Sequence, residues 1–268
     1  MSGSVELDAY LDRVGWRGDV RPDYETLAGL LDAHMARIPF ENLDVLLGRP
    51  VRLDLESLSS KLVAERRGGY CFEHASLFAA VLQRVGFAVV RHTARVVLYV
   101  PRHLAPRTHM FLTVTLPAGR FIVDPGFGGL AARVPVPWPA MAPPSDGMQH
   151  WVARDGEQWV LRTRVADQVK DCWVSTMETD HSIDFEVANH YTSTHPASPF
   201  RNRLMLRALT PTGHVAVMNR DVTETRGEQS HTRVLRDRAS LRALVCEHFG
   251  FDLPAIDAMR VPSIPEWR

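Results

Sequence analysis

Cys71 is the residue of this chain that is best placed for covalent chemistry. It follows Gly68 and Gly69, which permit a sharp turn, and it precedes an apolar run that predicts a helix beginning at the cysteine. A helix N-terminus carries unpaired N–H groups and a partial positive charge, which stabilise a thiolate and could accept a developing oxyanion. The position therefore favours a nucleophile, although a lone cysteine is more often a buried, inert residue.

A nucleophilic cysteine needs a base and a residue that orients the base. The candidate bases are His92, His103 and His109, and Asp124 is the candidate orienting residue. His109 opens an apolar strand-like segment, whereas Asp124 ends one and precedes Pro-Gly, where an aspartate is ordinarily a turn former. Residue types alone leave both roles open.

The strand register bears on whether these groups can meet. If residues 117–120 close a simple hairpin, Asp124 lies opposite Thr113, and His109 lies about 14 Å further along the same face. A contact between the histidine and the aspartate would then require a bulge or a different pairing of the strands.

A metal site is the alternative use of Cys71, because His74 completes a C-x-x-H spacing. Structural zinc sites use four ligands in paired short spacings, and no second pair of this kind is present. The remaining cysteines, Cys172 and Cys246, fall in a strand-like and a helix-like pattern and read as buried core residues. We therefore expect no metal.

The composition excludes several classes of protein. The chain has 268 residues, of which 45% are hydrophobic, enough for a sizeable core. Its 31 basic and 31 acidic side chains balance, so there is no basic surface to recruit nucleic acid or an anionic membrane. We see no secretory signal, no apolar run of membrane-spanning length and no disulfide framework, and we expect a cytoplasmic protein.

The elements that must position these residues change in type along the chain. Helical periodicity predicts helices over 24–37, from Ser57 to about Arg67, and over 71–85. Strand patterns follow over 91–100, 109–116, 121–124, 151–163 (a hairpin) and 171–177, with a Pro-rich loop over 134–144. The last part mixes helices (185–191, 239–249) with strands (203–209, 214–218). The pattern predicts an α+β fold with a small, mostly antiparallel sheet or barrel in the middle.

Five segments together carry a family resemblance. Residues 66–74 (RRGGYCFEH), 108–114 (THMFLTV) and 123–128 (VDPGFG) look, in order and spacing, like the three signature segments of arylamine N-acetyltransferases. Residues 38–43 (IPFENL) and 193–200 (STHPASPF) resemble two more. The length resembles that of the prokaryotic members.

The resemblance implies a Cys–His–Asp triad of Cys71, His109 and Asp124 in a cysteine-protease-like core. It implies three regions: a helical bundle (1–86) carrying the nucleophile, a β-barrel (87–195) carrying the histidine and aspartate, and an α/β lid (196–268). One departure is Ala75, where many members have asparagine. We expect this departure to change packing without abolishing activity.

The resemblance also implies the reaction. An acetyl group would pass from acetyl-CoA, a co-substrate, through an acetyl-cysteine to the nitrogen or oxygen of arylamines, arylhydrazines and N-hydroxyarylamines, with ping-pong kinetics. The partners would be acetyl-CoA and a small aromatic amine or hydrazine, with no bound cofactor, nucleic acid or membrane. The chain would act in xenobiotic metabolism as a monomer or homodimer.

The family segments suggest binding residues as well. Aromatic candidates for the ring pocket are Phe40, Tyr70, Phe127 and Phe200, for which ordinary core packing is the alternative. Backbone N–H groups at Gly126, Gly128 and Gly129 could bind the CoA pyrophosphate, although the lysine of a Walker loop is missing. By analogy with the family, Glu41 and Arg67 form a structural ion pair behind the cysteine; two solvated charges are the alternative.

Three other functions fit the same residues. A Cys–His–Asp hydrolase would use water as the acceptor. An amide synthase, or a transferase for a longer acyl-CoA, would differ in pocket volume beside Phe127 and Phe200. A CoA- or ligand-binding protein with an inactive site would leave Cys71 no more reactive than a free thiol.

Overall fold

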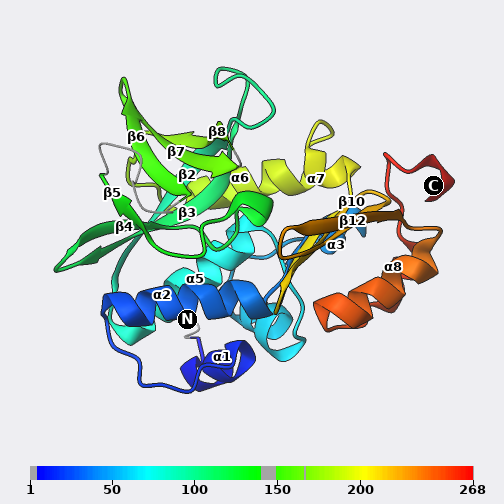
Figure 1. The fold of residues 1–268 in the computed structure, drawn as a ribbon, viewed down its shortest axis with the longest axis horizontal. Coiled ribbons are helices and arrows are strands. Elements are labelled where there is room, and N and C mark those ends of the chain that lie inside the picture. The colour runs from blue at the N-terminus through cyan, green and yellow to red at the C-terminus, as the bar shows by residue number, and fades with distance from the viewer. Residues whose placement is uncertain (1–4, 140–148, 166, 268) are drawn as a thin grey trace.

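The computed structural model describes residues 5–139, 149–165 and 167–267. Its fold is α+β, as predicted: helices of the first third lie beside a strongly curved sheet, and a second sheet with α8 lies to the right of both in Figure 1. Of the Pro-rich segment predicted as a loop, residues 140–144 lie outside the described residues.

The N-terminal third is helical. Its helices are α1 (Leu7–Val14), α2 (Tyr24–Arg37), α3 (Leu43–Leu46), α4 (Leu55–Leu58), a π turn (Ser59–Ala64) and α5 (Cys71–Val85). The predicted bounds of α2 and α5 are confirmed, because Asp23 caps the start of α2 and Gly86, with φ of 105°, ends α5. The expected helix start at Ser57 is wrong: Asp54 accepts a hydrogen bond from the Ser57 N–H and caps α4.

The middle of the chain forms a nearly closed antiparallel barrel. Its strands are β2 (Ala88–Val96), β3 (Arg107–Leu116), β4 (Gly119–Val123), β5 (Val136–Trp138), β6 (His150–Asp155), β7 (Gln158–Val165) and β8 (Gln168–Ser175), in the order β5-β4-β3-β2-β8-β7-β6. The end strands β5 and β6 contact each other. The prediction of a loop over 134–144 is wrong for residues 136–138, which form strand β5. Pro137 is tolerated there because β5 has a ladder partner only in β4.

The β3–β4 turn decides the position of Asp124. Leu116 pairs with Gly119, so the turn has two central residues and not the four of the simple hairpin. The register therefore places Thr113 opposite Ile122, and Asp124 lies two residues closer to His109 than expected. Side chains on this face of β3 point into the barrel, whereas the alternate ones pack on α5.

The last part of the chain builds a second antiparallel sheet. It is ordered β1-β9-β10-β11-β12, with β1 (Phe40–Glu41), β9 (Met205–Thr210), β10 (Gly213–Met218), β11 (Asp221–Arg226) and β12 (Gln229–Val234). Strand β1 comes from the helical third, so the sheet joins the first and last parts of the chain. Strands β11 and β12 escaped prediction because they are mostly polar and β12 is exposed throughout.

The chain after the barrel also contains three helices. They are α6 (Ser182–Thr194), α7 (Pro199–Asn202) and α8 (Arg238–Leu244), which continues into a π turn (Val245–Phe249). Helix α6 is longer than the predicted 185–191. Cys246, expected to be buried, is exposed, because it lies away from the buried helix face formed by Leu241, Leu244 and Val245.

Candidate active site

Cys71 is the first residue of α5 and is buried, with 3% of its surface exposed. Its Sγ lies 3.8 Å from the carbonyl oxygen of Thr108, just before His109. Gly126 packs directly against it: a Cβ there would lie 2.6 Å from the Cys71 Cα, closer than real contacts allow. Glycine is therefore required at 126 for the barrel loop to reach the nucleophile.

The tight turn before Cys71 also depends on glycines. A Cβ on Gly68 would lie 2.0 Å from the Pro39 carbonyl oxygen, and one on Gly69 would lie 2.6 Å from a Glu73 carboxylate oxygen. Glu73 sits at the third position of α5 and accepts the Tyr70 N–H at 3.1 Å. The backbone that leads into α5 is thus packed between the Pro39 carbonyl and the Glu73 carboxylate.

His109 and Asp124 are in contact inside the barrel. His109 Nε2 donates to Asp124 Oδ2 at 2.8 Å, and both side chains are about 2% exposed. Burial alone would lower the pKa of His109, but the Asp124 carboxylate and then Cys71 raise it to about 10. The buried imidazole is therefore protonated at neutral pH, with its Nδ1 left for the thiol.

Trp173 is a second donor to the same carboxylate, and sequence reasoning missed it. Its indole Nε1–H donates to Asp124 Oδ2 at 3.0 Å from β8, across the barrel. Asp124 Oδ1 is buried and has no hydrogen-bond partner among the described residues. The pattern around residue 173 predicts only a strand, so no sequence signal distinguishes this tryptophan from a core residue.

The other candidate histidines have different surroundings. His92 bonds to the Glu178 carbonyl and the Thr113 hydroxyl, both at 2.9 Å, and His103 is exposed. His74, the candidate metal partner of Cys71, has both ring nitrogens engaged elsewhere. Within the described part of the chain, no group of three or more potential ligands could hold a metal ion.

His74 belongs to a buried chain of hydrogen bonds behind the nucleophile. Its Nε2–H donates to the carbonyls of Gly69 (3.1 Å) and Pro39 (3.2 Å), so its Nδ1 must accept from His34 Nε2–H at 2.8 Å. His34 Nδ1 then accepts the Tyr10 hydroxyl at 2.9 Å. Burial lowers the pKa of His74 to about 4, so this relay is neutral.

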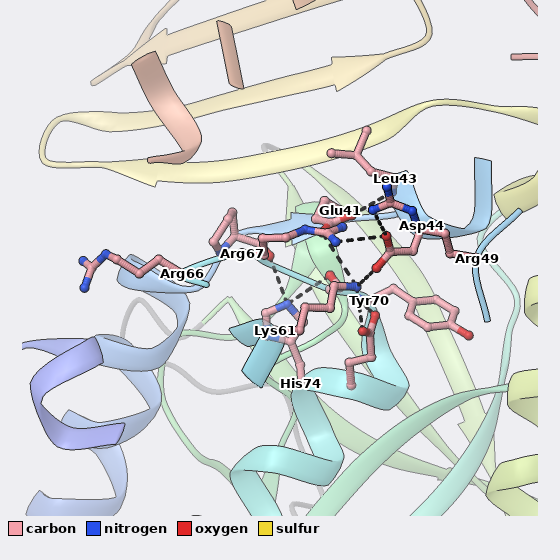
Figure 2. A network of polar contacts seen from close by, with 12 residues as sticks. Glu41, Leu43, Asp44, Arg49, Lys61, Arg66, Arg67, Tyr70 and His74 are labelled. Atoms are coloured by element: carbon pink, nitrogen blue, oxygen red, sulfur yellow. Dashed lines mark hydrogen bonds and ion pairs between the residues drawn. The ribbon is translucent and has the colours of Figure 1, made fainter. Parts of the chain in front are cut away.

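A cluster of five buried charges lies beside the turn that precedes Cys71 (Figure 2). Arg67 contacts Glu41 at 2.9 Å and Asp44 at 3.0 Å. Lys61 lies 2.8 Å from Asp44 and 2.7 Å from Glu73. The Glu41–Arg67 pair is thus part of a network whose other members are spread over residues 44–73, and sequence reasoning missed them. Their separation in the sequence gives no signal of contact.

The aromatic candidates have different environments. The Phe127 ring lies edge-on to His109 at 5.0 Å, beside the reacting groups. Phe40 and Phe200 are half-buried neighbours at 6.3 Å. Tyr70 is fully buried, and its hydroxyl donates to Asn189, so its ring packs in the core. Ala75 is also fully buried there.

The glycines at 128 and 129 adjoin the second sheet. Gly128 has φ of +70°, and a Cβ there would lie 3.9 Å from the Phe40 ring. A Cβ on Gly129 would lie 3.6 Å from Arg207 Nη1. Arg207 pairs with Phe40 across β1 and β9, so the two side chains share a face. Sequence reasoning did not single out this arginine.

Arg207 is a half-buried cation whose charge is not neutralised nearby. Burial lowers the pKa of its guanidinium, and none of the described residues forms an ion pair or hydrogen bond with it. Such a group beside glycine N–H groups suits a phosphate. Among the residues that the structure describes, no helix is both long and apolar enough to cross a bilayer.

Comparisons with known proteins agree over nearly the whole chain. The N-acetyltransferase family model matches residues 23–258. The arylamine N-acetyltransferase of Mycolicibacterium smegmatis is 38% identical over 260 residues, covering 93% of each chain. The arylamine N-acetyltransferase / N-hydroxyarylamine O-acetyltransferase of Salmonella typhimurium is 34% identical, covering 91% of this chain and 88% of its own length.

Solved structures show the same similarity. The structure of Mycobacterium marinum arylamine N-acetyltransferase in complex with CoA superposes with a TM-score of 0.87 at 32% identity, covering 94% of each chain.

Proposed function

This chain belongs to the arylamine N-acetyltransferase family, and we infer that Cys71, His109 and Asp124 are the triad that carries out its reaction. The enzyme transfers an acetyl group from acetyl-CoA to arylamines, arylhydrazines and N-hydroxyarylamines. The observation that carries the triad is the 2.8 Å bond from His109 to Asp124 beside a cysteine at a helix N-terminus.

The first half-reaction consumes the thiolate. Cys71 Sγ attacks the thioester carbonyl, the C–S bond to CoA breaks, and His109 gives its proton to the departing CoA sulfur. An acetyl-cysteine and a neutral imidazole remain. Asp124 holds the imidazole orientation and stabilises its charged form before the transfer.

The second half-reaction restores the ion pair. The acceptor nitrogen attacks the acetyl carbonyl, His109 takes the proton from that nitrogen, and the Cys71 thiolate leaves. The edge-on ring of Phe127 beside His109 supports a flat aromatic acceptor at this position. Phe40 and Phe200 would form the more distant wall, whereas Tyr70 would support the turn from the core.

We propose that Arg207 and the Gly128–Gly129 backbone bind the CoA phosphates. The guanidinium supplies charge and the glycines supply N–H groups, next to the Phe40 ring. Gly126 has a different role, since its lack of a side chain admits the loop to Cys71.

We place the enzyme in the cytoplasm, acting on foreign amines. A nucleophilic thiolate survives in a reducing compartment, and the three cysteines are free.

Intact mass after mixing the protein with acetyl-CoA alone tests the triad. We expect one acetyl adduct, absent in Cys71→Ala and cleared by an aromatic amine. Steady release of CoA without an adduct would indicate a hydrolase. If neither an adduct nor a release of CoA is observed, the result favours an inactive ligand-binding site.

A pair of arginine variants tests the phosphate site. Arg207→Met should raise the KM for acetyl-CoA about tenfold, the loss of one modest charge-assisted contact, and leave the reaction with p-nitrophenyl acetate unchanged. Arg91→Met is the matched control, because Arg91 is also half-buried and has no acidic partner among the described residues, but it bonds Ser182 on α6. Equal effects on both donors would exclude phosphate binding by Arg207.

A further inference from the structure

Asp124 receives both of its hydrogen bonds on one oxygen. His109 Nε2–H and Trp173 Nε1–H both donate to Oδ2, at 2.8 and 3.0 Å, and Oδ1 has no partner in the described part of the chain. A carboxylate bound by His109 alone could turn about its last side-chain torsion, which is soft and two-fold. The Trp173 N–H is a second contact on the same oxygen and fixes this torsion.

The position of Trp173 is fixed by its surroundings. The side chain is fully buried in the barrel and stacks on Phe111 with ring centroids 4.2 Å apart. Its strand pairs with β2 only at the end of that strand, after a register shift between Ala94 and Arg95. Packing and strand register therefore fix the indole N–H in the direction of Asp124. If the carboxylate rotated, the indole could not move with it and the hydrogen bond would be lost.

We propose that Trp173 is a positioning residue of the acetyl transfer, which acts by holding the Asp124 carboxylate toward His109. The proposal rests on the triad assigned above. A residue of β8 then has a share in keeping the imidazole charged, because the carboxylate that Trp173 holds toward His109 is the group that raises the pKa of that histidine.

The other titratable groups around the pair do not take over this role. Cys71 faces His109 from α5. His150 on β6 and Cys172 on β8 interact electrostatically with Asp124. Burial nevertheless lowers the pKa of His150, and it raises that of Cys172 to about 12. Both are neutral when the enzyme works, so the Trp173 N–H is the contact that can be removed without changing a charge.

The test compares two tryptophan variants of the full chain. Trp173→Phe keeps a ring against Phe111 and removes the N–H donor. Trp159→Phe is the matched control, because Trp159 lies in the same barrel, edge-on to Trp138 at 5.5 Å. The readout is the rate of acetyl-cysteine formation from acetyl-CoA across the pH range, with the melting temperature recorded for both variants.

We expect Trp173→Phe to slow acetylation ten- to a hundredfold and to move the alkaline limb of the acetylation profile to lower pH by about one unit. Trp159→Phe should leave the limb where it is. In an Asp124→Asn background, Trp173→Phe should have little further effect, because the group it positions is gone.

An alkaline limb that stays unchanged in Trp173→Phe, or effects of Trp173→Phe and Asp124→Asn that simply multiply, would overturn the proposal. Failure of the triad itself looks different, since the wild-type protein would then form no acetyl adduct.

Discussion

Two buried histidines near Cys71 show what decides whether a histidine is catalytic. His74 lies three residues from the cysteine on α5, and His109 lies 38 positions along the chain, in the barrel. Both are almost fully buried, at 1% and 2% exposure. Yet burial lowers the pKa of His74 to about 4, whereas that of His109 is raised to about 10.

The difference comes from the partners. His74 bonds two backbone carbonyls and a neutral histidine. None of these offsets the free energy needed to bury a charged imidazolium. His109 bonds a carboxylate, whose charge does offset this free energy. Closeness in sequence to the nucleophile therefore says little about role. The same residue type becomes a neutral link in one place and a protonated acid in the other.

The strongest test of this comparison replaces each histidine by glutamine. His109→Gln should lower single-turnover acetylation about 10³-fold, because no proton can then be donated to CoA or taken from the amine. His74→Gln should cost less than about tenfold, because an amide can donate to Gly69 and accept from His34 as the imidazole does. Similar losses in the two variants would contradict the assignment.

Asp124→Asn removes what makes His109 different from His74. We expect acetylation to fall about 10²-fold and the alkaline limb of its pH profile to move down by about one to three pH units, since burial alone lowers the pKa of His109. The limb is measured as the rate of acetyl-cysteine formation across the pH range. His92→Gln serves as a control, since His92 bonds Thr113 and the Glu178 carbonyl and should leave the limb unchanged.

The two histidines should also give stability opposite dependences on pH. Below pH 6.5 an unfolded histidine binds a proton that folded His74 refuses, so the free energy of unfolding falls by about 1.4 kcal/mol per pH unit as pH drops from 6.5 toward 4. Folded His109 keeps a proton that the unfolded chain releases above 6.5, so its contribution is lost as pH rises toward 10.

Urea unfolding at several pH values measures both slopes, in a Cys71→Ala protein so that the thiol does not titrate. His74→Gln should flatten the acid side and His109→Gln the alkaline side. A variant that flattens the opposite side would show that the pKa assignments are reversed.

Local patterns were enough for several parts of the molecule. The apolar spacing and end residues of α2 and α5 depend on neighbours within a turn or two, so their bounds could be predicted. The same holds for the position of Cys71 at a helix start. The family segments add the expected triad, although residue spacing alone left the contact of His109 with Asp124 open.

The sequence by itself determined the helices around Cys71, the α+β class and the family. Only the tertiary structure decided the two-residue turn that brings Asp124 to His109, the Trp173 donor from across the barrel and the Lys61 contacts behind the nucleophile turn. The physical reason is range. Periodicity and capping act between neighbours along the chain, whereas charge state and hydrogen-bond partners depend on which distant strands and helices burial brings together.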